Sequence, residues 1–243
     1  MSNVRTVSDT KRDFYSHHTR PINSIYRRVV EELMVEMHLL SVNVDFEYDP
    51  IYALGVVTSF NRFMEGYKPE ADKQSIFAAL CQAVGGSCQG YKEDGEKILL
   101  IARRLSGNEI ISWLSRPTSI ERSLDLPNTL SAIAENPKFK YSRLFAIGLF
   151  TLLEEADSEL VRNQKQLNEV LQEISQSLNL PQEKVQKDLE LYRSNLEKMA
   201  QVQSAMADIV QADRKKREQR LQDKNQPETS APDDMISDRK VRG

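Results

Sequence analysis

The chain has 243 residues, of which 40% are hydrophobic and 28% charged, and its formal net charge is −3. This hydrophobic fraction supports a packed core and excludes global disorder. The balanced charge excludes a dedicated nucleic-acid-binding protein, which needs a strongly basic surface. With only 9 Gly and 9 Pro, the composition favours long helices over a turn-rich β fold.

Helical spacing and capping residues recur along the first 156 residues. A cap at Ser8 predicts a short first helix, and apolar residues spaced by three and four from Ile22 to Leu40 predict a second of about five turns. Asp49-Pro50 opens the next helix, which Gly66 closes. Further helices are expected over residues 71–84, 91–105, a short segment after Asn108, 126–135 and 141–153. The last is apolar on nearly all faces, so we place it at the centre of a bundle.

The pattern changes after about residue 157, where two narrow apolar stripes follow one another. Each stripe alternates spacings of four and three and carries one glutamine, Gln164 or Gln203. Asn179-Leu180-Pro181 separates the stripes, which predicts an antiparallel, coiled-coil-like helical hairpin. The stripes comprise Leu160, Gln164, Leu167, Leu171, Ile174 and Leu178, and then Val185, Leu189, Tyr192, Leu196, Met199, Gln203, Met206 and Val210.

The predicted fold is therefore all-α, a multi-helix bundle followed by a long C-terminal helical hairpin. We expect a bundle over residues 1–156, the hairpin over 157–212, and a polar tail over 213–243 with the composition of a disordered segment. The tail begins with the basic run Arg214–Arg217. Such a run usually caps a helix end, although it also attracts anionic lipid.

The sequence contains no recognisable catalytic motif, so we predict a protein that is not an enzyme and needs no cofactor or metal. Its histidines are His17, His18 and His38. They favour ordinary hydrogen bonds, and the alternative is a tetrapyrrole site, for chlorophyll or haem, that combines His38 with His17 or His18. Cys81 and Cys88 match no common zinc spacing, and we expect reduced thiols, with Cys81 on an apolar helix face and Cys88 in an oxidisable loop.

The end of the second stripe is the candidate partner-binding surface, with Met199, Gln203, Met206 and Val210 as its residues. The hairpin helix is longer than a bundle covers, and methionine adapts to irregular contacts. The alternative is that these residues pack within the hairpin against Leu160, Leu167 and Leu171. The longest apolar run is about half of the roughly 20 residues that a membrane span needs, so we expect a protein that is soluble when isolated.

Several contiguous blocks resemble the thylakoid formation protein family, and the likeness covers about residues 1–212. The blocks are Thr6–Tyr15, His18–Ile22, Ser24–Arg28, Glu31–Leu33, Tyr48–Gly55, Asn61–Tyr67 and Leu189–Met199. The chain starts directly at the first block, without a transit peptide, and so looks cyanobacterial.

The resemblance implies an all-helical, non-enzymatic accessory factor in thylakoid membrane biogenesis and in photosystem II assembly or repair. It implies support for the accumulation of FtsH-type membrane proteases, with these proteases and photosystem II subunits as partners. The expected location is peripheral, on the cytoplasmic side of the thylakoid membrane. The family offers no catalytic residues to carry over to this chain.

Overall fold

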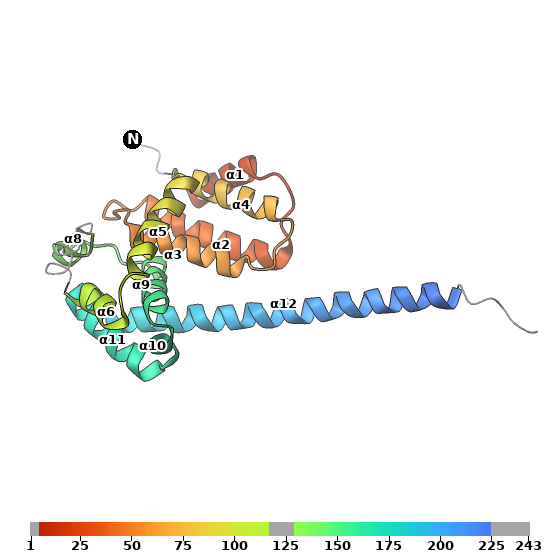
Figure 1. Cartoon of the computed structure of the whole chain (residues 1–243). Helices are drawn as coiled ribbons and strands as arrows, with labels where there is room; N and C mark the ends of the chain where they lie inside the picture. The colour runs from red at the N-terminus through yellow and green to blue at the C-terminus, as the bar shows by residue number, and fades with distance from the viewer. Residues whose placement is uncertain (1–4, 117–128, 225–243) are drawn as a thin grey trace, which may run out of the picture. The chain divides into compact units, whose positions relative to one another are not determined.

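The computed structural model describes residues 5–116 and 129–224, and in these ranges the chain is helical, with no strand (Figure 1). This confirms the predicted all-α class. In the same ranges, every helix is too short or too polar to cross a membrane. The helices are α1 (Val7–His17), α2 (Ser24–Ser41), α3 (Pro50–Phe63), α4 (Glu70–Ala83), α5 (Cys88–Ala102), α6 (Gly107–Ser115), α8 (Thr129–Glu135), α9 (Arg143–Ala156), α10 (Ser158–Arg162), α11 (Gln164–Ser177) and α12 (Gln182–Lys224).

The chain forms two compact units, which divide at Met199 and Ala200. The first unit contains α1 to α11 and the beginning of α12, so residues 157–199 belong to it together with the predicted bundle. The second unit starts at Ala200 and remains helical to Lys224. The first part of the predicted tail, from Asp213 to Lys224, is therefore helical. This segment contains no glycine or proline that would end the helix. The rest of that tail lies outside the described residues.

Helix α9 lies at the centre of the first unit, as its sequence predicts. All residues from Leu144 to Leu153 are buried. Helix α9 packs mainly against α3, which packs in turn against α5. Glycines allow the closest approach, because a Cβ atom on Gly55 would lie 1.7 Å from the Leu144 carbonyl oxygen and one on Gly148 would lie 2.0 Å from that of Ile51. Backbone therefore meets backbone where α3 crosses α9.

Several helix ends differ from the sequence prediction because other residues cap them. Thr6, not Ser8, caps α1 in a capping box with Asp9. Ser106, not Asn108, caps α6 in a second box with Glu109. The predicted Asp49 cap of α3 is confirmed, and its carboxylate accepts hydrogen bonds from two backbone N–H groups.

The turn between α11 and α12 reverses the chain as predicted. Asn179 has a φ of 53°, a left-handed conformation that asparagine tolerates, and the Leu180 N–H donates to the Ser175 carbonyl at 2.8 Å. Arg193 then donates to Gln164 at 2.6 Å. These two residues are nearly equidistant from the turn, so α11 and the start of α12 run antiparallel.

Candidate partner-binding surfaces

No group of three or more potential metal ligands occurs within residues 5–116 and 129–224. His17 is exposed, whereas His18 and His38 are buried. The His38 Nδ1 atom lies 2.8 Å from the Thr10 hydroxyl, and the His18 Nδ1 atom lies 3.0 Å from the Ser75 hydroxyl. Burial lowers the pKa of both buried imidazoles, which favours their neutral forms.

The two buried histidines occupy different parts of the first unit. Thr10 and His18 are separated by about 12 Å of helix rise along α1. His38 contacts α1 near its start, and His18 follows its end and contacts α4. The structure therefore holds the two rings in separate contacts and does not bring them together.

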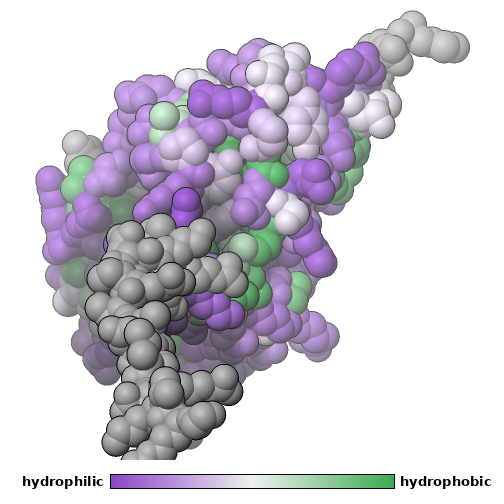
Figure 2. Space-filling view, turned by 90° about the vertical axis from the view of Figure 1, so that its right-hand side faces the viewer, coloured by the Kyte–Doolittle hydropathy of each residue, from purple (hydrophilic) through white to green (hydrophobic). Residues whose placement is uncertain are grey.

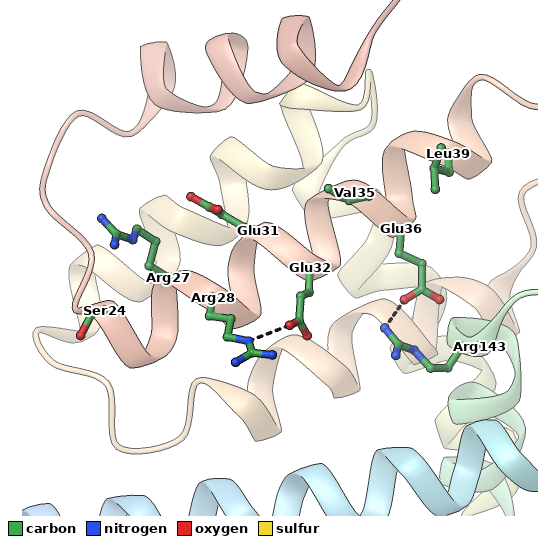
Figure 3. A pocket seen from close by; sticks show the side chains of 9 residues that line it. All are labelled: Ser24, Arg27, Arg28, Glu31, Glu32, Val35, Glu36, Leu39 and Arg143. Carbon is green, nitrogen blue, oxygen red and sulfur yellow. Dashed lines mark hydrogen bonds and ion pairs between the residues drawn. The ribbon is translucent and has the colours of Figure 1, made fainter.

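A groove with a volume of ≈ 610 Å³ runs along the outer face of α2 (Figure 3). Eight of its residues recur at helical spacing on α2, and Arg143 reaches it from the start of α9. The nine residues that line the groove are Ser24, Arg27, Arg28, Glu31, Glu32, Val35, Glu36, Leu39 and Arg143.

Charge and hydrophobicity divide this groove along its length. Arg28 pairs with Glu32 at 3.0 Å near the start of α2, as the i,i+4 spacing predicts. Glu31 accepts from Lys11 and Tyr15 of α1. Exposed Val35 and Leu39 stand one turn apart at the other end, with 37% and 57% of their surface accessible. Val35 and Leu39, here called the apolar step, therefore lie toward the end of α2, beside the Glu36–Arg143 pair.

The ion pair between Glu36 and Arg143 joins the α2 side of the groove to the start of α9 (Figure 3). It belongs to a wider polar cluster, because the Asp188 charge acts on Glu36 and both members of the pair act on Tyr141. Tyr141 donates to Asp188 at 2.9 Å, and the Lys184 ammonium lies 5.3 Å from the centre of the Tyr141 ring. Burial raises the pKa of Glu36, and the Arg143 charge opposes this shift. The cluster fixes the position of α2 relative to α9 and the start of α12.

The candidate residues on α12 fall into two groups. Met199 is buried in the core cluster of the first unit, so it is not available to a partner. Gln203 is half-buried, whereas Met206 and Val210 expose 41% and 68% of their surface. Leu160, Leu167 and Leu171, the packing partners in the alternative prediction, are buried in the core of the first unit, whereas Met206 and Val210 belong to the second unit.

The structure adds four exposed apolar residues that the sequence stripes omit. Val202 and Ile209 lie on the same helical segment as Met206, and Val35 and Leu39 lie on α2. Both pairs fall outside the predicted stripes. A search of the sequence for apolar residues outside the predicted stripes would therefore have identified these four positions. On the face drawn in Figure 2, hydrophobic residues form small patches among hydrophilic ones.

Comparison with known proteins gives one consistent result. The family model for thylakoid formation protein matches residues 6–221. Protein Thf1 of Nostoc punctiforme is 61% identical over 227 residues, which cover 93% of this chain and 97% of that protein. Protein Thf1 of a Picosynechococcus species is 58% identical over 217 residues, or 89% of this chain and 85% of its own.

A solved structure of Psb29 extends the likeness to the fold. It superposes with a TM-score of 0.74 at 48% sequence identity and covers 88% of this chain and 98% of its own. The family match spans nearly all of the described helices, from the start of α1 to the last turns of α12. The chain therefore belongs to the thylakoid formation protein family.

Proposed function

We propose that this protein is a non-enzymatic accessory factor that supports the accumulation of FtsH-type membrane proteases and thereby the assembly and repair of photosystem II. The family to which the chain belongs is named for thylakoid formation and is not a family of enzymes. Beyond this family role, we propose which partners the chain binds and which of its surfaces bind them.

The observation that carries the proposal is the exposed face of α2. A helix that packs its buried side on the core normally turns charged residues outward, yet α2 places Val35 and Leu39 there. An apolar step beside arginine side chains is typical of surfaces that bind other proteins. The Glu36–Arg143 pair anchors this step to α9 and keeps it in place before a partner arrives.

The helical segment from Ala200 supplies a second surface. Its exposed apolar residues are Val202, Met206, Ile209 and Val210, and the basic run Arg214–Arg217 follows. Basic residues near an anionic lipid surface each contribute about 1 kcal/mol of attraction. We therefore infer a peripheral position on the cytoplasmic side of the thylakoid membrane, within reach of membrane-bound proteases and photosystem II subunits.

The experiment replaces the apolar step of α2 in a cell that otherwise lacks the protein. A Val35→Asp, Leu39→Asp double variant should accumulate to the normal level, because both side chains are already exposed, while the level of the FtsH-type protease falls. Leu100→Asp on α5 is the matched control, since Leu100 is also exposed but lies away from the groove. Normal protease levels in the double variant would remove α2 from the proposal.

A further inference from the structure

The sequence contains two cysteines, and the fold places them at one turn. Cys81 lies in the last turn of α4, and Cys88 is the first residue of α5. Both thiols are free. Cys81 is fully buried, whereas Cys88 is partly exposed and packs against the core cluster that contains Cys81.

The turn between them brings the chain back over Cys81. Gly85 has a φ of 78°, and the Gly86 N–H donates to the Cys81 carbonyl at 2.9 Å. A Cβ atom on Gly86 would lie 2.7 Å from the Tyr91 ring, so only glycine allows this ring to close over the turn. Ser87 then caps α5 by accepting from the Gly90 N–H. These contacts fix Cys88 beside the end of α4.

The side chains around Cys81 and Cys88 also favour a reaction between the two thiols. Cys88 packs against the core cluster that contains Cys81, and it is among the groups that raise the pKa of the Cys81 thiol. The Lys92 ammonium, one turn beyond Cys88, lies 5.5 Å from the centre of the Phe77 ring, which is one turn before Cys81. Cationic side chains and helix N-termini are the surroundings in which cysteines react. The pair thus combines two thiols at one tight turn, a nearby cation and access for a small oxidant on one side.

We propose that Cys81 and Cys88 form a reversible intramolecular disulfide when a peroxide oxidises Cys88. The class of oxidant is a small hydroperoxide, of which hydrogen peroxide is the simplest. The disulfide would link the end of α4 to the start of α5. This modification site is independent of the partner surfaces described above.

The reaction proceeds in two steps that balance. The Cys88 thiolate attacks one peroxide oxygen, so an S–O bond forms, the O–O bond breaks, and hydroxide leaves and takes up a proton as water. The Cys81 sulfur then attacks the Cys88 sulfenic sulfur, the S–S bond forms, and the S–O bond breaks. A second water leaves with the Cys81 proton. Two electrons pass from the sulfurs to the peroxide, and a dithiol reverses the reaction by exchange.

The order of the two steps follows from the surroundings of each thiol. Burial raises the pKa of Cys81, and a negative charge on Cys88 raises it further, whereas Lys92 opposes the shift. Cys81 is therefore a poor first nucleophile, and peroxide meets Cys88 first because that side chain is accessible.

The test uses the reduced full-length protein, treated with hydrogen peroxide, quenched by acid and alkylated under denaturing conditions. We expect the intact mass to fall by two hydrogens, both cysteines to resist alkylation, and peptide mapping to recover a Cys81–Cys88 link. Dithiothreitol should restore two alkylatable thiols. Oxidation of Cys88 to sulfinic acid with Cys81 still alkylatable would overturn the proposal, as would a disulfide between two chains.

Two variants assign the roles. In Cys81→Ala, which keeps a small apolar side chain at the buried position, Cys88 should give a sulfenic acid that dimedone traps. In Cys88→Ala, the remaining thiol should react with peroxide more slowly than Cys88 does in the wild type. Equal peroxide reactivity of the two variants would contradict the assigned order. If Cys81→Ala fails to fold, the peptide map of the wild type still decides whether the link forms.

Discussion

The Arg143 guanidinium donates to the Glu36 carboxylate at 2.6 Å and so joins the first residue of α9 to the middle of α2. The two residues are far apart in sequence, and neither lies on an apolar stripe. Glu36 is held in a largely buried position, with 18% of its side chain exposed, where an unpaired charge would be unfavourable. This pair therefore orients the α2 groove.

Removal of the arginine should destabilise the fold. Arg143→Met keeps most of the apolar stem but leaves the Glu36 charge without its partner, and we expect a loss of about 2 kcal/mol in the free energy of unfolding at neutral pH. Denaturant titration measures this loss. The double variant Arg143→Met, Glu36→Gln is the control, and it should recover much of the stability because no charge remains unpaired. A double variant no more stable than the single one would contradict the explanation.

The stability loss of the Arg143→Met variant should become smaller at acidic pH. The pKa of Glu36 is raised by burial, so the folded state binds its proton more readily than the unfolded state does. Stability from this group therefore falls as pH rises above the ordinary carboxyl pKa, and the loss of Arg143 raises the folded pKa further. The difference between Arg143→Met and wild type should shrink as the pH falls toward that ordinary value. A constant difference from neutral pH to acid would exclude Glu36 as the cause.

Asp49 gives a second prediction, in which stability depends on pH between the unfolded and folded pKa values of this residue. Burial raises its pKa to about 7, against two backbone hydrogen bonds that lower it. Since the folded pKa exceeds the unfolded value of 3.8, the folded state binds the extra proton between these values, and stability falls as pH rises across that range. Asp49→Asn keeps an oxygen acceptor and should flatten this part of the stability profile. An unchanged profile would assign the pH dependence to other groups.

Helix spacing was sufficient to predict the class of fold, the central position of residues 144–153 and the turn at Asn179. These features depend on patterns within one element or on local backbone preference. The Glu36–Arg143 pair and the separation of His18 from His38 depend on which helices become neighbours, and one sequence carries no direct signal for that. The cap of the first helix was misplaced because Thr6 and Ser8 are chemically similar, and only Thr6 forms the capping box with Asp9.

The sequence also did not predict the crossing of α3 and α9, because a glycine inside a helix does not indicate which helix it will approach. The structure makes both Gly55 and Gly148 necessary. Gly148→Ala would place a methyl group 2.0 Å from the Ile51 carbonyl oxygen, so the helices must separate. We expect a loss of more than about 4 kcal/mol or failure to fold, measured by thermal and denaturant unfolding. Gly90→Ala is the matched control, because its new methyl group meets only ordinary contacts and improves helix propensity by up to about 1 kcal/mol.

The exposed residues of the second unit allow stability to be separated from partner binding. Met206→Asp with Val210→Asp should change the free energy of unfolding by less than about 0.5 kcal/mol, because both side chains are exposed and neither charge would be buried. If this segment binds the partner as we propose, the recovery of FtsH-type protease with the affinity-purified chain should fall in the same variant. Leu191→Asp, an exposed position earlier on α12, is the control and should leave recovery unchanged. A large loss of stability in the double variant would show that these residues are buried in the folded chain, and unchanged protease recovery would exclude them as a binding surface.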